Sequence, residues 1–113
     1  TISFVVSDEN EFTIADYITY PNPFSSSTDI YFQHNKPNQN LDVDLRIYSI
    51  TGVLVKQFEE NYTDNGYRIG PINWNGKDDY GGQISPGMYI AKLDVYSDDG
   101  DFTSKSIRII LMR

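Results

Sequence analysis

The chain has 113 residues, 39% of them hydrophobic and 14% aromatic, which is enough apolar material for the core of one domain. Nine Lys and Arg against sixteen Asp and Glu give a formal net charge of −7. Such a chain repels the phosphates of nucleic acids and an anionic membrane surface, so we expect no nucleic-acid partner. No apolar run approaches the roughly 18 residues of a membrane helix, so no membrane span is expected. The absence of cysteine excludes disulfides and a cysteine nucleophile.

Alternation of apolar and polar residues with a period of two predicts seven β-strands and no helix. In chain order, these strands cover residues 12–20, 28–34, 41–50, 53–60, 69–74, 88–97 and 102–111. The third strand is the clearest, because its apolar residues at 41, 43, 45 and 47 alternate with charged residues at 42, 44 and 46. Residues 2–6 are a candidate extra strand. Since the chain begins at Thr1 in strand-like sequence, we interpret it as part of a longer protein.

Seven short strands, each with one apolar face, predict an all-β fold of the immunoglobulin-like class, a seven-stranded antiparallel β-sandwich. We expect it to cover residues 17–113, with residues 1–16 as an N-terminal lead-in. A small closed barrel is the alternative. Three hairpin turns are predicted, at Thr51-Gly52, at residues 65–66 (Asn-Gly) and at Asp99-Gly100, with Gly52 at positive φ in a bulge.

Two aromatic side chains are expected to anchor the core. Trp74 ends a strand, and burial of a Trp side chain contributes about 3–5 kcal/mol relative to Ala. Phe24 follows Pro21-Asn22-Pro23, where the two prolines cannot donate ladder hydrogen bonds and must end the strand. Phe24 can then fill one end of the core.

No residue pattern predicts catalysis or a cofactor. The single histidine, His34, follows a strand in a polar stretch and lacks a nucleophile elbow, so we expect it at a strand end or on the surface. Two acidic clusters, at residues 73–79 and 98–101, are candidate calcium sites, because they place side-chain oxygen ligands near glycines. The first cluster does not fit an EF-hand, because Lys77 occupies a ligand position, and Asn and Asp beside glycines more commonly form turns.

The third and sixth predicted strands contain apolar residues on the face opposite the core, and these residues predict a contact surface. If the third and sixth strands are neighbours, these residues form an apolar patch on an acidic domain, and such a patch commonly marks an interface. The alternative is that the chain's own loops or residues 2–6 cover it. The predicted interface residues are Tyr48, Ile50, Met88, Ile90 and Tyr96.

Four stretches, in this order, resemble a bacterial Ig-like family that includes flagellar hook-capping domains and type IX secretion C-terminal domains. They are YPNPF at 20–24, RIYSITGVLV at 46–55, WNGKDDYGG at 74–82 and PGMYI at 86–90. Within the family, the tryptophan loop at 74–82 is similar to that of the sortase branch, the gingipain-related cysteine peptidases of type IX secretion. The resemblance rests on the following residues: Pro21, Asn22, Pro23, Phe24, Gly52, Trp74, Gly76, Asp78, Gly81, Gly87 and Tyr89.

The resemblance implies a non-catalytic C-terminal module at the outer membrane or cell surface of a Gram-negative, Bacteroidetes-type bacterium. It implies that the catalytic Cys and His of the parent peptidase lie upstream. It also implies that the module acts in sorting or docking, with an outer-membrane secretion protein or the upstream catalytic domain as partner. Two alternatives remain open, a cleavable sorting domain of another secreted protein and a carbohydrate-binding or adhesion module using exposed tyrosines.

Overall fold

The computed structural model describes residues 12–37, 39–63 and 66–112, and in these ranges it contains strands, turns and loops but no helix. The candidate strand at residues 2–6 and most of the expected lead-in lie outside the described residues. The seven strands are β1 (Ile14–Tyr20), β2 (Thr28–His34), β3 (Leu41–Ser49), β4 (Leu54–Tyr62), β5 (Arg68–Trp74), β6 (Gly87–Ser97) and β7 (Phe102–Leu111).

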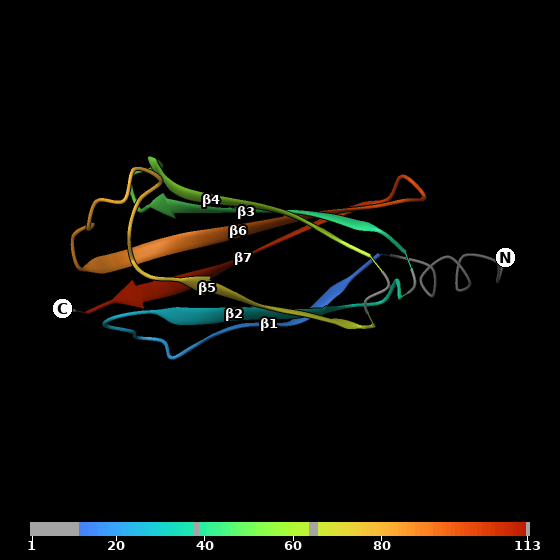
Figure 1. The fold of residues 1–113 in the computed structure, drawn as a ribbon, viewed down its shortest axis with the longest axis horizontal. Coiled ribbons are helices and arrows are strands. Elements are labelled where there is room, and N and C mark those ends of the chain that lie inside the picture. The colour runs from blue at the N-terminus through green and yellow to red at the C-terminus, as the bar shows by residue number, and fades with distance from the viewer. Residues whose placement is uncertain (1–11, 38, 64–65, 113) are drawn as a thin grey trace, which may run out of the picture.

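The strands form two stacked sheets (Figure 1), a three-stranded sheet in the order β1-β2-β5 and a four-stranded sheet in the order β4-β3-β6-β7. All paired strands are antiparallel. This arrangement confirms the predicted seven-stranded immunoglobulin-like sandwich and excludes the closed barrel. Because successive side chains of a strand point to opposite faces, alternate residues of each strand face the other sheet and the residues between them face outward.

Two of the three predicted hairpins are present. In the β3–β4 hairpin, the Gly52 amide donates to the Ser49 carbonyl at 3.0 Å, and Gly52 has the predicted positive φ, 91°. The β6–β7 hairpin has the same form, with Gly100 at φ 87°. In both hairpins the residue with positive φ is a glycine in a tight turn, where any other residue would be strained by its Cβ atom.

The hairpin predicted at residues 65–66 is wrong. Asn65 lies outside the described residues, but the flanking strands β4 and β5 belong to different sheets. The Asn-Gly dipeptide favours a turn, but it does not determine whether the two strands on either side of the turn pair with each other. Here the chain instead crosses from one sheet to the other, and the Tyr67 carbonyl accepts a hydrogen bond from the His34 amide of β2 at 2.8 Å.

The core lies between the sheets and contains side chains from all strands except β4, whose Val55, Phe58 and Tyr62 pack against its margin. Phe12 and Ile14 are also buried, and both precede residue 17, where we expected the sandwich to begin. The Tyr17 hydroxyl of β1 donates to the Ala91 carbonyl of β6 at 3.0 Å and thereby joins the two sheets. Burial, and then the charge of Asp94, raise the pKa of Tyr17, so the hydroxyl stays protonated.

Candidate docking surface

Trp74 and Phe24 occupy one end of the core, as predicted. Trp74 is fully buried, and its ring centroid lies 5.3 Å from that of Phe24 and 5.9 Å from that of Tyr89. The indole nitrogen of Trp74 donates to the Lys77 carbonyl at 2.9 Å, and the Tyr89 hydroxyl donates to the Ser85 carbonyl at 2.5 Å. The polar atoms of both buried rings therefore bond to the backbone of the same long loop, which fixes that loop over the core.

The segment 21–24 runs along the outer edge of β7. The Phe24 amide donates to the Ile110 carbonyl at 2.9 Å, and the Phe24 carbonyl accepts from the Met112 amide at 2.8 Å. The Asn22 side chain adds two bonds, since Nδ2 donates to the Arg108 carbonyl and Oδ1 accepts from the Ile110 amide, both at 3.0 Å. β1 ends at Tyr20, as the prolines require. The segment thereby occupies backbone groups that an edge strand otherwise leaves unpaired.

The acidic residues of the tryptophan loop build turns. Asp78 Oδ1 accepts from the amides of Tyr80 at 3.0 Å and Gly82 at 2.8 Å, and the Asp78 amide donates to the Gly82 carbonyl at 2.9 Å. Gly76 and Gly81 hold φ values of 73° and 84°. Across the described residues, no group of three or more His, Cys, Asp or Glu is arranged to hold a metal ion. Asp78 thus has the turn-forming role that its sequence context favours.

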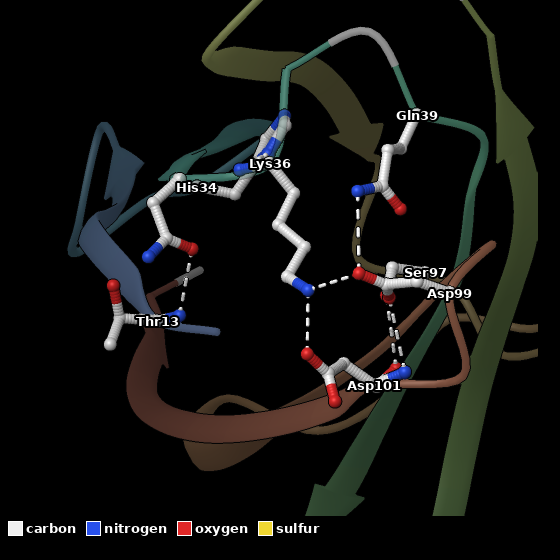
Figure 2. Close-up of polar contacts among 8 residues, drawn as sticks. Thr13, His34, Lys36, Gln39, Ser97, Asp99 and Asp101 are labelled. Atoms are coloured by element: carbon white, nitrogen blue, oxygen red, sulfur yellow. Dashed lines mark hydrogen bonds and ion pairs between the residues drawn. The ribbon is translucent and has the colours of Figure 1, made fainter. Parts of the chain in front are cut away.

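In the second acidic cluster, two carboxylates contact one lysine (Figure 2). The Lys36 ammonium contacts carboxylate oxygens of both Asp99 and Asp101, and Asp99 also accepts from the Ser97 hydroxyl. Bonds from Lys36 and then Ser97 lower the pKa of Asp99, while bonds to Asp101 and then Asp99 raise the pKa of Lys36. This polar cluster ties the loop after β2 to the tip of the β6–β7 hairpin.

His34 lies at the end of β2, as expected, but it is only 4% exposed rather than on the surface. Its Nδ1 accepts a hydrogen bond from the Lys36 amide at 3.1 Å, which places the ring in a structural role at the base of the polar cluster. Its alternation with the buried Ile30 and Phe32 could have shown that it faces inward.

The outer face of the four-stranded sheet brings together four of the five predicted interface residues. β3 and β6 are neighbours, and Tyr48 lies directly opposite Ile90. Met88 is 39% exposed in the next row of β6, and Ile50 is 71% exposed in the adjoining β3–β4 hairpin. Tyr48 and Ile90 are half-buried. Such a contiguous apolar surface on an acidic domain fits a contact role.

Two exposed residues that the sequence analysis did not select extend this surface. Leu54 of β4 lies opposite Tyr48, and Ile110 of β7 lies opposite Met88. The apolar patch therefore spans all four strands of the sheet. Strand order, which the sequence signals do not give, was needed to find them. The patch consists of Tyr48, Ile50, Leu54, Met88, Ile90 and Ile110.

The fifth predicted interface residue, Tyr96, lies apart from the apolar patch. It is paired with Asp42 and Phe102 at the other end of the sheet, six residues from Ile90 along β6. Its ring packs against that of Phe102 at an interplanar angle of 41°, with centroids 4.8 Å apart. Two rows of charged residues separate it from the patch, so Tyr96 and the patch are distinct surfaces.

The exposed tyrosines do not form a common platform among the described residues. Tyr20 ends β1, Tyr67 precedes β5, Tyr80 lies in the tryptophan loop and Tyr96 lies in β6. Of these four tyrosines, Tyr96 lies beside another exposed aromatic ring, that of Phe102. The described residues also contain no helix long and apolar enough to cross a membrane.

Comparison with known proteins agrees with this architecture. A crystal structure of dimeric latent PorU from Porphyromonas gingivalis matches with a TM-score of 0.76 and 30% identity, over 89% of this chain and 9% of the PorU chain. CopC from Methylosinus trichosporium OB3b matches with a TM-score of 0.55 and 16% identity, over 89% of this chain and 93% of CopC, a likeness of fold alone. No curated protein sequence matches the chain.

The family is established by sequence as well. The model of the secretion system C-terminal sorting domain matches residues 18–109, which include β2 to β6 in full, the last three residues of β1 and most of β7. Its matched range contains the proline segment at residues 20–24, the tryptophan loop at 74–82 and the PGMYI stretch at 86–90, on which the resemblance was based. The chain therefore belongs to the family of C-terminal sorting domains of type IX secretion.

Proposed function

We propose that this domain is the C-terminal module of a secreted, surface-located cysteine peptidase of the PorU type, and that it docks to the secretion machinery through the apolar patch. The 30% identity to PorU over 89% of the chain supports the choice of parent. This chain spans only 9% of PorU and contains no cysteine, so the catalytic cysteine of such a parent would lie outside it. The domain itself binds the secretion machinery and does not catalyse a reaction.

The observation that carries this proposal is the position of the apolar patch. It gathers six apolar side chains on one sheet face of a chain with net charge −7. Exposed apolar patches of this kind are costly in water unless a partner covers them. Two partners fit this role, an outer-membrane protein of the secretion machinery and the upstream catalytic domain.

The test uses the full-length parent protein in the secreting bacterium. Ile50→Ser with Met88→Ser removes two exposed apolar side chains and leaves the buried core intact. We expect less parent protein attached at the cell surface. Tyr80→Ser is the matched control, because Tyr80 is 96% exposed outside the patch, and it should leave attachment unchanged. Equal attachment of the double variant and the wild type would reject the proposed surface.

The cleavable sorting domain is the second candidate, and the family match supports it directly. It differs in one measurable outcome, since the mature secreted protein then lacks this segment. Mass spectrometry of the surface-located product distinguishes the two. Peptides from residues 18–109 in that product indicate a retained docking module, and their loss together with an intact upstream part indicates a cleaved signal.

A further inference from the structure

The sandwich has four outer strands, and three of them carry features that hinder pairing with another chain. The proline segment covers the edge of β7. β1 has a bulge between Ala15 and Ile18. Its Ile14 carbonyl also accepts a hydrogen bond from the Lys105 ammonium group at 3.0 Å. β5 contains Pro71, which has no backbone amide hydrogen to donate. Bulges, prolines and covering segments are the means by which natural sheets protect their edges.

The fourth outer strand is β4 (Figure 1), and its edge is covered along its first half alone. There the Asp79 amide donates to the Val55 carbonyl at 3.1 Å, and Asp79 Oδ1 accepts from the Gln57 amide at 3.3 Å. In an antiparallel strand, alternate residues point both of their backbone groups to the same side. Glu59 and Asn61 therefore direct their amide and carbonyl groups away from β3, and these groups have no partner among the described residues.

Acidic and apolar side chains flank this open half of β4. Glu59 pairs with Asp44 on the outer side of the sheet, whereas Glu60 pairs with the buried Val43 and lies at the margin of the core. Both glutamates are exposed, and neither forms an ion pair within the part of the chain that the structure describes. Phe58, which also faces the core side, is half-buried.

We infer that the open half of β4 pairs with an extended, basic segment of a partner protein. The free backbone groups of Glu59 and Asn61 supply the hydrogen bonds of the added strand, as in other cases of β-augmentation. The residue opposite Phe58 points to the core side, where an apolar side chain covers the Phe58 ring. The residues opposite Glu59 and Glu60 are Lys or Arg, because each meets a free carboxylate across the new strand pair. Three consecutive residues of the segment are thus apolar, basic and basic.

The charge of this edge selects such a segment over a second copy of the chain. Two copies paired through β4 would bring two sets of Glu59 and Glu60 together, and like charges on neighbouring strands are destabilising. A cavity of about 430 Å³, whose lining includes Asp42, Glu59 and Asn61, gives room on the outer side for a long basic side chain. The site is separate from the apolar patch, whose Leu54 lies in the covered half of β4.

The test uses amide hydrogen exchange, followed by nuclear magnetic resonance, with the capped synthetic peptide TVKKVT as the probe. This peptide presents the apolar, basic, basic order in both strand directions. The amides of Glu59 and Asn61 should exchange rapidly in the chain alone, and saturating peptide should slow their exchange about tenfold or more. The amides of Phe58 and Glu60 point toward β3, so their exchange should change little.

Two control peptides separate strand pairing from charge attraction. TVEEVT keeps the backbone and reverses the charge, and TVKKVT with a methyl group on every backbone nitrogen keeps the charge and loses the donors. Neither should bind.

On the protein side, Glu59→Lys should weaken binding of TVKKVT about tenfold, because an attractive cross-strand pair becomes repulsive. Asp29→Lys is the matched control, since it makes the same charge change on the outer face of the other sheet, and it should bind like the wild type. Circular dichroism melting curves confirm that each variant is folded.

Three results would each overturn the inference: exchange at Glu59 and Asn61 that TVKKVT does not slow, equal binding of the methylated peptide, or wild-type affinity of Glu59→Lys. The outcome is separate from that of the proposed function. Ile50→Ser with Met88→Ser changes the apolar patch and leaves this edge intact, so it should weaken docking of the parent protein without changing the affinity for TVKKVT.

Discussion

The Trp74 indole packs against the Phe24 ring with centroids 5.3 Å apart and an interplanar angle of 53°. The two residues come from the end of β5 and from the proline segment after β1, so this contact joins the three-stranded sheet to the edge of β7. The proline segment and the tryptophan loop are distant in sequence, and they support the same end of the core.

We expect Trp74→Ala to lower the free energy of unfolding by about 3–5 kcal/mol, because it leaves a large cavity in a fully buried site. Phe24→Ala should have a cost of similar size. Urea unfolding of the two single variants and the double variant measures their coupling. The double variant should lose less than the two single losses combined, and strict additivity would contradict a direct energetic link between the rings.

Asn22→Ala should destabilise the domain by about 1–2 kcal/mol, because two hydrogen bonds to the β7 backbone are lost at once. Asn22→Asp is the matched variant, since it keeps the acceptor for the Ile110 amide and loses the donor to the Arg108 carbonyl. The free energy of unfolding of Asn22→Asp, measured in urea, should lie between those of the wild type and Asn22→Ala. If Asn22→Ala unfolds like the wild type, the side chain does not contribute to closing this edge.

Tyr17→Phe removes the hydroxyl that joins β1 to β6 and keeps the buried ring. We expect a loss of about 0.5–1.5 kcal/mol in the free energy of unfolding, the net value of one intramolecular hydrogen bond. Because burial raises the pKa of Tyr17, its absorbance should not change to that of tyrosinate until the domain unfolds in alkali. An alkaline spectrophotometric titration of the wild type and of Tyr17→Phe measures the ionisation of Tyr17 as the difference between the two curves. Tyr17 ionisation in the folded protein would contradict the buried bond.

The polar cluster predicts a pH-dependent contribution to stability. Lys36 and Ser97 lower the pKa of Asp99 below its ordinary value of about 3.9. The contribution of the Asp99 carboxylate to the free energy of unfolding is therefore fully present above about pH 4, and it is lost as the pH falls toward the pKa that Asp99 has in the folded protein. Asp99→Asn should be less stable than the wild type at neutral pH, and the difference should shrink in acid.

Chemical unfolding at neutral pH and in acid measures this difference. In a Lys36→Met background, which removes the ammonium group, the effect of Asp99→Asn should depend much less on pH. If the wild type and the Asp99→Asn variant differ in stability by the same amount at both pH values, the ion pair is not the source of the difference.

The alternation in the sequence determined the strands and the side each residue faces. In β3, residues 41 to 47 alternate between the core and solvent as predicted, because neighbouring side chains of a strand must point to opposite faces. The ends of β1 and of the two confirmed hairpins were also predictable, since proline and glycine act locally through their own backbone dihedrals. The same local signals led to the family resemblance that the comparisons confirm.

Only the tertiary structure decided which strands are neighbours. The turn after β4 looks like a hairpin in sequence, yet β5 pairs with β2 in the other sheet. Pairing is a long-range choice set by how all the apolar faces are buried together, and no short motif encodes it. For the same reason the sequence could nominate Tyr48, Ile90 and Tyr96 as outward-facing, but register alone placed the first two together and set Tyr96 apart beyond the charged rows.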